Sequence, residues 1–236
     1  MTSVDWYVPM NQLRAHDELI LMWSGGKDAA LALDVLHSQS PRRIGALLTT
    51  VRDDDQTVTM HGTPRSLIER QADRLDLPLH IMSIPNGASN AVYEKALHET
   101  LQPIVEQGST TVVAGDLFLD DVKAYRERVL REAGVRPLFP LWKRDTDWLA
   151  RHFLRRGYRA LVVSVDSVQL DPSFVGRTYD EAFLEALPAS VDPCGEHGAF
   201  HTLVVDGPPF RDRVPVRVVG AQGDGRMHYA TLEWDE

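Results

Sequence analysis

The residues most able to do chemistry lie together near the start of the chain: Ser24, Gly25, Gly26, Lys27 and Asp28. They separate an apolar run, residues 19–23, from a segment, residues 27–37, with apolar residues at helical spacing. Adjacent glycines between a strand and a helix leave backbone N–H groups bare at a helix N-terminus, where an anion is stabilised. Lys27 supplies a positive charge suited to phosphate, and Asp28 is placed to hold Mg²⁺. The pattern predicts a nucleotide site.

Two familiar types of phosphate-binding loop fit this segment less well. A Walker A loop needs Ser or Thr directly after its lysine, and Asp28 stands there. The G-x-G-x-x-G pattern of dinucleotide-binding proteins is also absent. The alternative interpretation is that the segment binds nothing. Ser24, Gly25 and Gly26 would then form a tight turn, and Asp28 would only complement the helix dipole.

The elements that must position this loop alternate between strands and helices. The spacing predicts further strands at 44–50, 79–84 and 110–115, and helices at 64–75, 90–107 and 120–133. We expect Thr63 to cap the helix that begins with Pro64. Such alternation implies right-handed crossovers and a parallel sheet. Ligands bind beyond the strand ends of such sheets. Thr49 and Thr50 should therefore lie near the adenosine, and Gly115 and Asp116 near the phosphates and Mg²⁺.

The rest of the chain does not continue the regular alternation of strands and helices. Helices are predicted at 146–156 and 179–187, strands at 159–165, 200–205, 214–219 and 228–234, and a Pro/Gly-rich loop at 188–199. We therefore predict an α/β fold, a doubly wound parallel sheet of the Rossmann-like nucleotide type, with a smaller C-terminal α+β region. The expected division is a nucleotide-binding domain at 1–140 and a substrate or acceptor region at 141–236.

Composition limits the partners. The 236 residues carry a net charge of −9 and a pI of about 5.5, which disfavours nucleic acid. One cysteine, Cys194, excludes an internal disulfide. The N-terminus lacks the features of a signal peptide, and no run approaches the roughly 20 apolar residues that span a membrane. A cytoplasmic location without a membrane partner is expected.

The chain resembles the N-type ATP pyrophosphatase superfamily and, within it, the diphthine–ammonia ligase family over nearly its whole length. The resemblance rests on residues 23–28 (WSGGKD), 60–63 (MHGT), 115–128, 136–142, 192–206 (DPCGEHGAFHTLVVD) and 207–210. It implies that ATP is cleaved to AMP and pyrophosphate, that a carboxylate is activated as an acyl-adenylate, and that ammonia from ammonium displaces AMP. The acceptor in that family is diphthine on elongation factor 2. The phosphate loop would then hold the pyrophosphate portion of ATP, and Asp28 and Asp116 would hold Mg²⁺.

Two residues depart from the family pattern. Ala29 replaces a serine, and Ala199 replaces the second acid of the loop at 195–200. Glu196 is retained, and we expect it to orient or deprotonate ammonia unless the loop is only a solvated polar turn. Cys194 is either a nucleophile or a small packed residue. His61 could contact a phosphate or the acceptor, or be a loop histidine.

The predicted catalytic residues are therefore Lys27, Asp28 and Glu196. Two alternatives are a non-catalytic module that binds ATP or AMP, and a related adenylating enzyme with a different acceptor. The first is disfavoured by the Lys27–Asp28 pair and by the long C-terminal region. A sulfur-inserting relative is disfavoured by the single cysteine.

Overall fold

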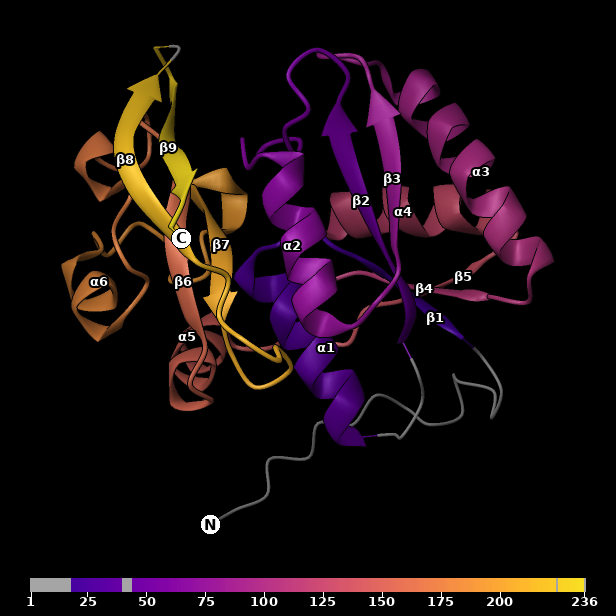
Figure 1. The fold of residues 1–236 in the computed structure, drawn as a ribbon, viewed down its shortest axis with the longest axis horizontal. Helices are drawn as coiled ribbons and strands as arrows, with labels where there is room; N and C mark the ends of the chain where they lie inside the picture. Colours follow the sequence, from indigo (N-terminus) through magenta and orange to yellow (C-terminus); the bar gives the residue numbers. More distant parts are fainter. Residues whose placement is uncertain (1–17, 40–43, 224, 236) are drawn as a thin grey trace.

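The structure is a computed structural model that describes residues 18–39, 44–223 and 225–235. It contains a parallel sheet and an antiparallel sheet side by side (Figure 1). The parallel sheet has five strands in the order β3-β2-β1-β4-β5, and every neighbouring pair is parallel. These strands are β1 (Leu19–Met22), β2 (Ile44–Arg52), β3 (Leu79–Ile84), β4 (Thr111–Val113) and β5 (Arg136–Leu138).

Helices cover both faces of this sheet. They are α1 (Lys27–Gln39), α2 (Arg65–Leu75), α3 (Asn90–Glu106) and α4 (Asp120–Glu132). Successive side chains of a strand point to opposite faces, and β1 shows the result. Leu19 and Leu21 join the core with α1 and α2, whereas Ile20 joins the core with α3 and α4. Burial on both faces explains why β1 is a continuous apolar run.

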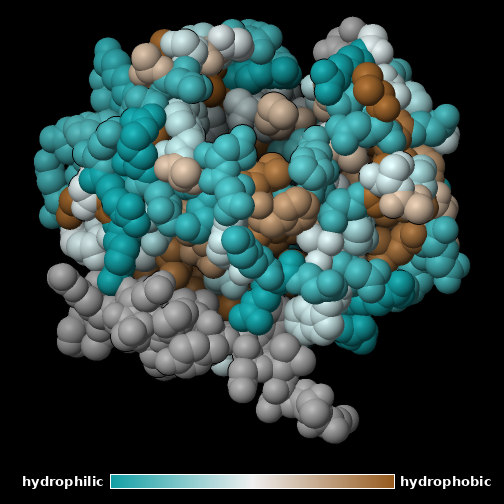
Figure 2. All heavy atoms as spheres, turned by 180° about the vertical axis from the view of Figure 1, so that it is seen from behind, coloured by the Kyte–Doolittle hydropathy of each residue, from teal (hydrophilic) through white to brown (hydrophobic). Residues whose placement is uncertain are grey.

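The C-terminal region is built on the antiparallel sheet, whose strand order is β7-β6-β9-β8. Its strands are β6 (Arg159–Asp166), β7 (Phe200–Asp206), β8 (Val216–Gly223) and β9 (Met227–Trp234). Its helices are α5 (Thr146–Arg155) and α6 (Glu181–Ala186), with short 3₁₀ turns η2 (Pro172–Phe174) and η3 (Glu196–Gly198). On the face shown in Figure 2, hydrophilic residues predominate and apolar residues gather in smaller patches.

The predicted fold class is confirmed, with two local differences. Strand β5 was not predicted, because it has three residues and contains Pro137, which lacks an N–H donor; it lies at the sheet edge, where proline is tolerated. The predicted cap by Thr63 is wrong. Helix α2 begins at Arg65, Pro64 holds the cap position without a side-chain bond, and the Thr63 hydroxyl has no hydrogen-bond partner among the described residues.

Three other predictions have different outcomes. The absence of a signal peptide concerns residues that lie outside the described ranges. The division at residues 140 and 141 stays a prediction. Within the described part of the chain, no helix is long and apolar enough to cross a membrane.

The two sheets meet at the phosphate loop. Strand β7 lies against α1, and the Val204 N–H of β7 donates a hydrogen bond to the Gly25 carbonyl at 2.8 Å. Residues from both halves of the chain therefore shape the turn between β1 and α1.

Candidate active site

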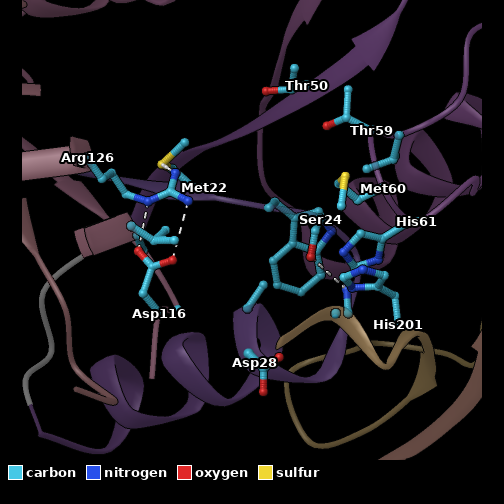
Figure 3. Close-up of a pocket in the computed structure, with 18 of the residues that line it drawn as sticks. Met22, Ser24, Asp28, Thr50, Thr59, Met60, His61, Asp116, Arg126 and His201 are labelled. Atoms are coloured by element: carbon cyan, nitrogen blue, oxygen red, sulfur yellow. Dashed lines mark hydrogen bonds and ion pairs between the residues drawn. The ribbon is translucent and has the colours of Figure 1, made fainter. Parts of the chain in front are cut away.

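A cavity of about 760 Å³ lies beyond the C-terminal ends of β1, β2 and β4 (Figure 3). This is the position at which open α/β sheets bind ligands. The cavity is lined by the turn between β1 and α1 and by residues 194–198 and 200–202 of the C-terminal region. With the exception of Gly25, every predicted site residue lines it.

The two glycines of the turn are required by its geometry. Gly25 has a φ of +80°, and a Cβ atom there would lie 2.7 Å from Oε1 of Gln71. A Cβ atom on Gly26 would lie 3.0 Å from the Thr202 carbonyl oxygen and 3.1 Å from Cε1 of His61. The conformation of Gly25 therefore requires glycine, and a side chain at Gly26 would have to push the Thr202 backbone or His61 aside.

A buried glutamine holds the turn in place. Gln71 of α2 is fully buried and accepts a hydrogen bond from Nε1 of Trp23 at 2.8 Å. Its amide nitrogen donates to the carbonyls of Gly25 at 3.0 Å and Val204 at 2.6 Å. Sequence reasoning missed Gln71. The available signal was a polar residue on the apolar stripe of α2, between buried Ile68 and Leu75.

Two of the backbone N–H groups expected to be bare already have partners. The Gly26 N–H donates to Oγ of Ser24 at 3.3 Å, and the Lys27 N–H donates to Oγ1 of Thr202 at 3.1 Å. Thr202 thus satisfies a donor at the start of α1 from a strand 175 residues away in sequence. That distance explains why the sequence did not predict its role.

Lys27 is buried at the base of the cavity. Its Nζ donates to Oδ2 of Asp28 at 2.9 Å and to the Cys194 carbonyl oxygen. Burial lowers the pKa of Lys27, but the negative charge of Asp28 and other acids outweighs burial and the pKa is raised. Lys27 is therefore a cation at neutral pH, as phosphate binding requires.

The two predicted metal ligands differ in their surroundings. Asp28 has one oxygen, Oδ1, enclosed without a hydrogen-bond partner among the described residues. Asp116 instead lies 2.8 Å from Nε of Arg126 and is turned toward it in Figure 3. No described group of three or more His, Cys, Asp or Glu residues is arranged to hold a metal ion. The free Oδ1 of Asp28 fits Mg²⁺, whereas Asp116 would first have to release Arg126. The metal roles of both residues stay predictions.

The other predicted nucleotide-binding residues line the cavity at the strand ends. Thr49 is buried, and its hydroxyl has no hydrogen-bond partner among the described residues; Thr50 is partly exposed. Gly115 lets the segment after β4 pack on α1, because a Cβ atom there would lie 2.9 Å from the Asp28 carbonyl. Contacts of these residues with adenosine or phosphate stay predictions.

The loop that carries Glu196 is strongly curved. Gly195, His197 and Gly198 have φ values of 72°, 63° and 76°, all in the left-handed region that glycine adopts most easily. The loop directs Glu196 to the cavity. Burial, together with the charge of Asp28, raises the pKa of Glu196 to about 7, although Lys27 opposes the shift. A carboxyl group of this kind can accept a proton at neutral pH.

Two residues near Glu196 in the sequence, Cys194 and Ala199, are buried in the protein. Ala199, which replaces the second acid of the family, is 1% exposed and belongs to the larger core. The Cys194 thiol is buried and lies 3.4 Å from the Thr146 carbonyl oxygen. Burial raises the pKa of Cys194 well above its usual value, so the thiol stays protonated. These surroundings favour a packed residue over a nucleophile.

His61 and His201 form the wall of the cavity beside Ser24 (Figure 3). Their ring centroids lie 4.4 Å apart. His61 therefore faces the cavity instead of standing in an open loop.

These features define a doubly wound α/β protein whose cavity lies where such proteins bind nucleotides. Comparison with known families is more specific. The diphthamide synthase N-terminal domain matches residues 17–137, and the diphthamide synthase C-terminal domain matches residues 145–234. The chain belongs to the diphthamide synthase family, which confirms the resemblance found in the sequence.

Curated relatives agree. A human protein is 28% identical over 176 residues, which cover 68% of this chain and 64% of the relative. A rat protein is 26% identical over 221 residues, which cover 82% of this chain and 80% of the relative. A fission-yeast protein is 25% identical over 211 residues, covering 81% of this chain and 34% of the relative. The chain thus spans less than two thirds of the human relative. All three are named diphthine–ammonia ligase.

Proposed function

We propose that this protein is an ATP-dependent ligase that joins ammonia to a carboxylate and releases AMP and pyrophosphate. The observation that carries the proposal is the contact between Lys27 and the Cys194 carbonyl. It places the phosphate loop and the Glu196 loop in one cavity, so that ATP and an acceptor can meet there. Family membership and the name of the relatives support the same activity.

In the first step, a carboxylate oxygen of the acceptor attacks the α-phosphorus of ATP, and the bond to the β-phosphate oxygen breaks. The products are an acyl-adenylate and pyrophosphate. This displacement needs positioning and charge stabilisation more than covalent help from the protein. Lys27 and the loop from Ser24 to Gly26 hold the leaving pyrophosphate, while Thr49 and Thr50 contact the adenosine.

Asp28 is the best placed residue for Mg²⁺, because its Oδ1 has no hydrogen-bond partner among the described residues, whereas Oδ2 of Asp116 lies 2.8 Å from Nε of Arg126. Mg²⁺ would supply charge neutralisation on the phosphate oxygens. Asp116 would be a second ligand only after its ion pair with Arg126 had opened.

In the second step, the nitrogen lone pair of ammonia attacks the acyl carbon. The carbon–nitrogen bond forms, the bond to the AMP oxygen breaks, and one proton leaves the nitrogen. Glu196 is the proton acceptor. Its raised pKa, about 7, lets it take this proton near neutral pH.

The proposed acceptor is diphthine on elongation factor 2, because the relatives are named for diphthine. A different carboxylate acceptor is the alternative within the same chemistry. A non-catalytic nucleotide-binding module is not favoured, because the C-terminal region contributes Glu196 and Thr202 to the cavity. A cytoplasmic location is part of this proposal.

The test is an incubation with Mg-ATP, ammonium and elongation factor 2 that carries diphthine. We expect AMP, pyrophosphate and the amide in equal amounts, and ADP with phosphate would contradict the first step. Lys27→Ala should slow AMP formation by roughly 10²-fold or more, as loss of a charge-stabilising group does. Lys95→Ala is the matched control, because Lys95 lies on α3 with 76% of its side chain exposed. Tight ATP binding without products would favour the non-catalytic module.

A further inference from the structure

Two histidines of the cavity have no role in the reaction described above. His61 lies in the segment between β2 and α2, and His201 lies in β7. Their rings are 4.4 Å apart, and His61 packs directly over Gly26 of the phosphate loop. Figure 3 shows the two rings on one wall, on the side of Ser24 opposite to Asp116 and Arg126. The pair is therefore close to the phosphate loop.

Each ring has one nitrogen atom that is enclosed but lacks a hydrogen-bond partner among the described residues. These atoms are Nδ1 of His61 and Nε2 of His201. Buried polar atoms without a partner are rare in folded proteins, and a ligand that bonds to them is one physical reason for their presence. Two of them on adjacent rings that line one cavity indicate a ligand with several hydrogen-bonding positions.

The tautomer of His61 follows from its other contact. Burial lowers the pKa of His61, and a hydrogen bond of the ring to the Thr202 backbone opposes this shift, which makes the ring the donor in that bond. Because Nδ1 has no partner, the donor is Nε2, and Nδ1 carries a bare lone pair. His61 therefore presents an acceptor to the cavity.

Both rings are neutral at neutral pH. Burial lowers the pKa of His61 well below its usual value, and the neighbouring His201 adds to the effect. Burial and then the charge of Lys27 lower the pKa of His201 to about 4. A neutral ring with a bare lone pair repels phosphate oxygens, so the site at Nδ1 of His61 selects a ligand that donates hydrogen bonds.

We propose that Nδ1 of His61 and Nε2 of His201 bind the ammonia molecule that attacks the acyl-adenylate, an inference that rests on the proposed ligase function. Ammonia has three N–H bonds. Two of them donate to the histidines and remain in the amide product, and the third hydrogen leaves as a proton to Glu196. The nitrogen lone pair is then free to form the bond to the acyl carbon. His201 takes the Nδ1–H tautomer in this arrangement.

Amide substitutions can separate the two nitrogen positions of each ring. An asparagine amide reaches the position of Nδ1, whereas a glutamine amide reaches that of Nε2. His61→Gln and His201→Asn therefore remove the proposed contacts, while His61→Asn and His201→Gln keep a polar atom near them. We expect the first pair to raise the KM for ammonium roughly three- to tenfold each, as expected for one lost hydrogen bond. The KM for ATP and acyl-dependent exchange of pyrophosphate into ATP should change less than twofold.

The conservative pair and a distant histidine are the controls. His61→Asn and His201→Gln should retain most of the affinity for ammonium, and His80→Gln on β3 should behave as wild type. Equal effects of the Asn and Gln variants at either position, or equal effects on the KM values of ATP and ammonium, would overturn the proposal.

A binding measurement keeps this test independent of the ligase reaction. The ring ¹⁵N signals of His61 and His201 in the wild-type protein should shift when ammonium chloride is added, and the His80 signal should not. Unchanged signals at ammonium concentrations that saturate AMP formation would refute the ammonia site while leaving the ligase intact. Shifted signals without any AMP formation would instead support the site and contradict the proposed reaction.

Discussion

Gln71 gives the sharpest test of how the phosphate loop is held. Gln71→Leu keeps a similar side-chain volume but removes three hydrogen bonds. Nε1 of Trp23 then becomes a buried donor without a partner, which costs about 1–3 kcal/mol. The Val204 carbonyl loses one bond, while the Gly25 carbonyl keeps the bond from the Val204 N–H. We expect the free energy of unfolding to fall by about 2–4 kcal/mol.

Denaturant unfolding and ATP kinetics measure the two consequences. A loss of this size should lower the melting temperature by roughly 5–15 °C in a chain of this length. The KM for ATP should also rise, because the Gly25 carbonyl keeps only one of the two hydrogen bonds that hold the turn. Gln102→Leu is the matched control, since Gln102 is exposed on α3 and its side-chain amide donates to Glu106 on the same helix.

A double-mutant cycle tests the reason for the loss. Trp23→Phe removes the indole N–H, so adding it to Gln71→Leu removes the unpaired donor itself. The two substitutions should therefore combine to a loss about 1–2 kcal/mol smaller than the sum of the single losses. Additivity within about 0.5 kcal/mol would refute the view that the indole bond is what Gln71 contributes.

Two further predictions concern acids of the cavity. Because the pKa of Glu196 is about 7 in the folded protein and 4.5 is its usual value, the folded state binds this proton more tightly. The free energy of unfolding should therefore fall as pH rises from about 4.5 to about 7, and urea titrations of Glu196→Gln should lack this part of the fall. Amide formation at constant free ammonia should rise through the same pKa in the wild type but not in Glu196→Gln. For Mg²⁺, Asp28→Asn should raise the concentration that gives half-maximal AMP formation about tenfold. Arg126→Met should lower this Mg²⁺ concentration by freeing Asp116. If Arg126→Met and Asp116→Asn both raise it, Asp116 has a structural role.

The parts of the molecule that follow from local pattern could be predicted. The apolar run of β1 requires burial on both faces, and the helices on both sides of the sheet supply it. The glycine turn followed by Lys27 and Asp28 likewise predicted where the cavity lies, because a loop of this type lies at the ends of the strands.

The parts that depend on contacts distant in sequence could not be predicted. The sequence marks Gln71 as a polar residue on an apolar stripe but does not say which groups it meets. Only the packing of β7 and α2 brings the side chains of Thr202 and Gln71 to the loop at residues 23–27. The ion pair of Asp116 with Arg126 is also a tertiary contact, and it changes the interpretation of Asp116 as a metal ligand. The resemblance to the family implies that Ala199 replaces an acid, but only the structure shows that Ala199 is buried in the core.

The attachment of β7 to the phosphate loop has a mechanical consequence. Three hydrogen bonds join the C-terminal region to the phosphate loop. They run from Val204 to Gly25, from Lys27 to Thr202 and from Lys27 to Cys194. A tilt of the antiparallel sheet against α1 therefore stretches the same bonds that shape the cradle for ATP. A fragment that ends at residue 140 would keep the glycines of the loop but lose all three of these hydrogen bonds.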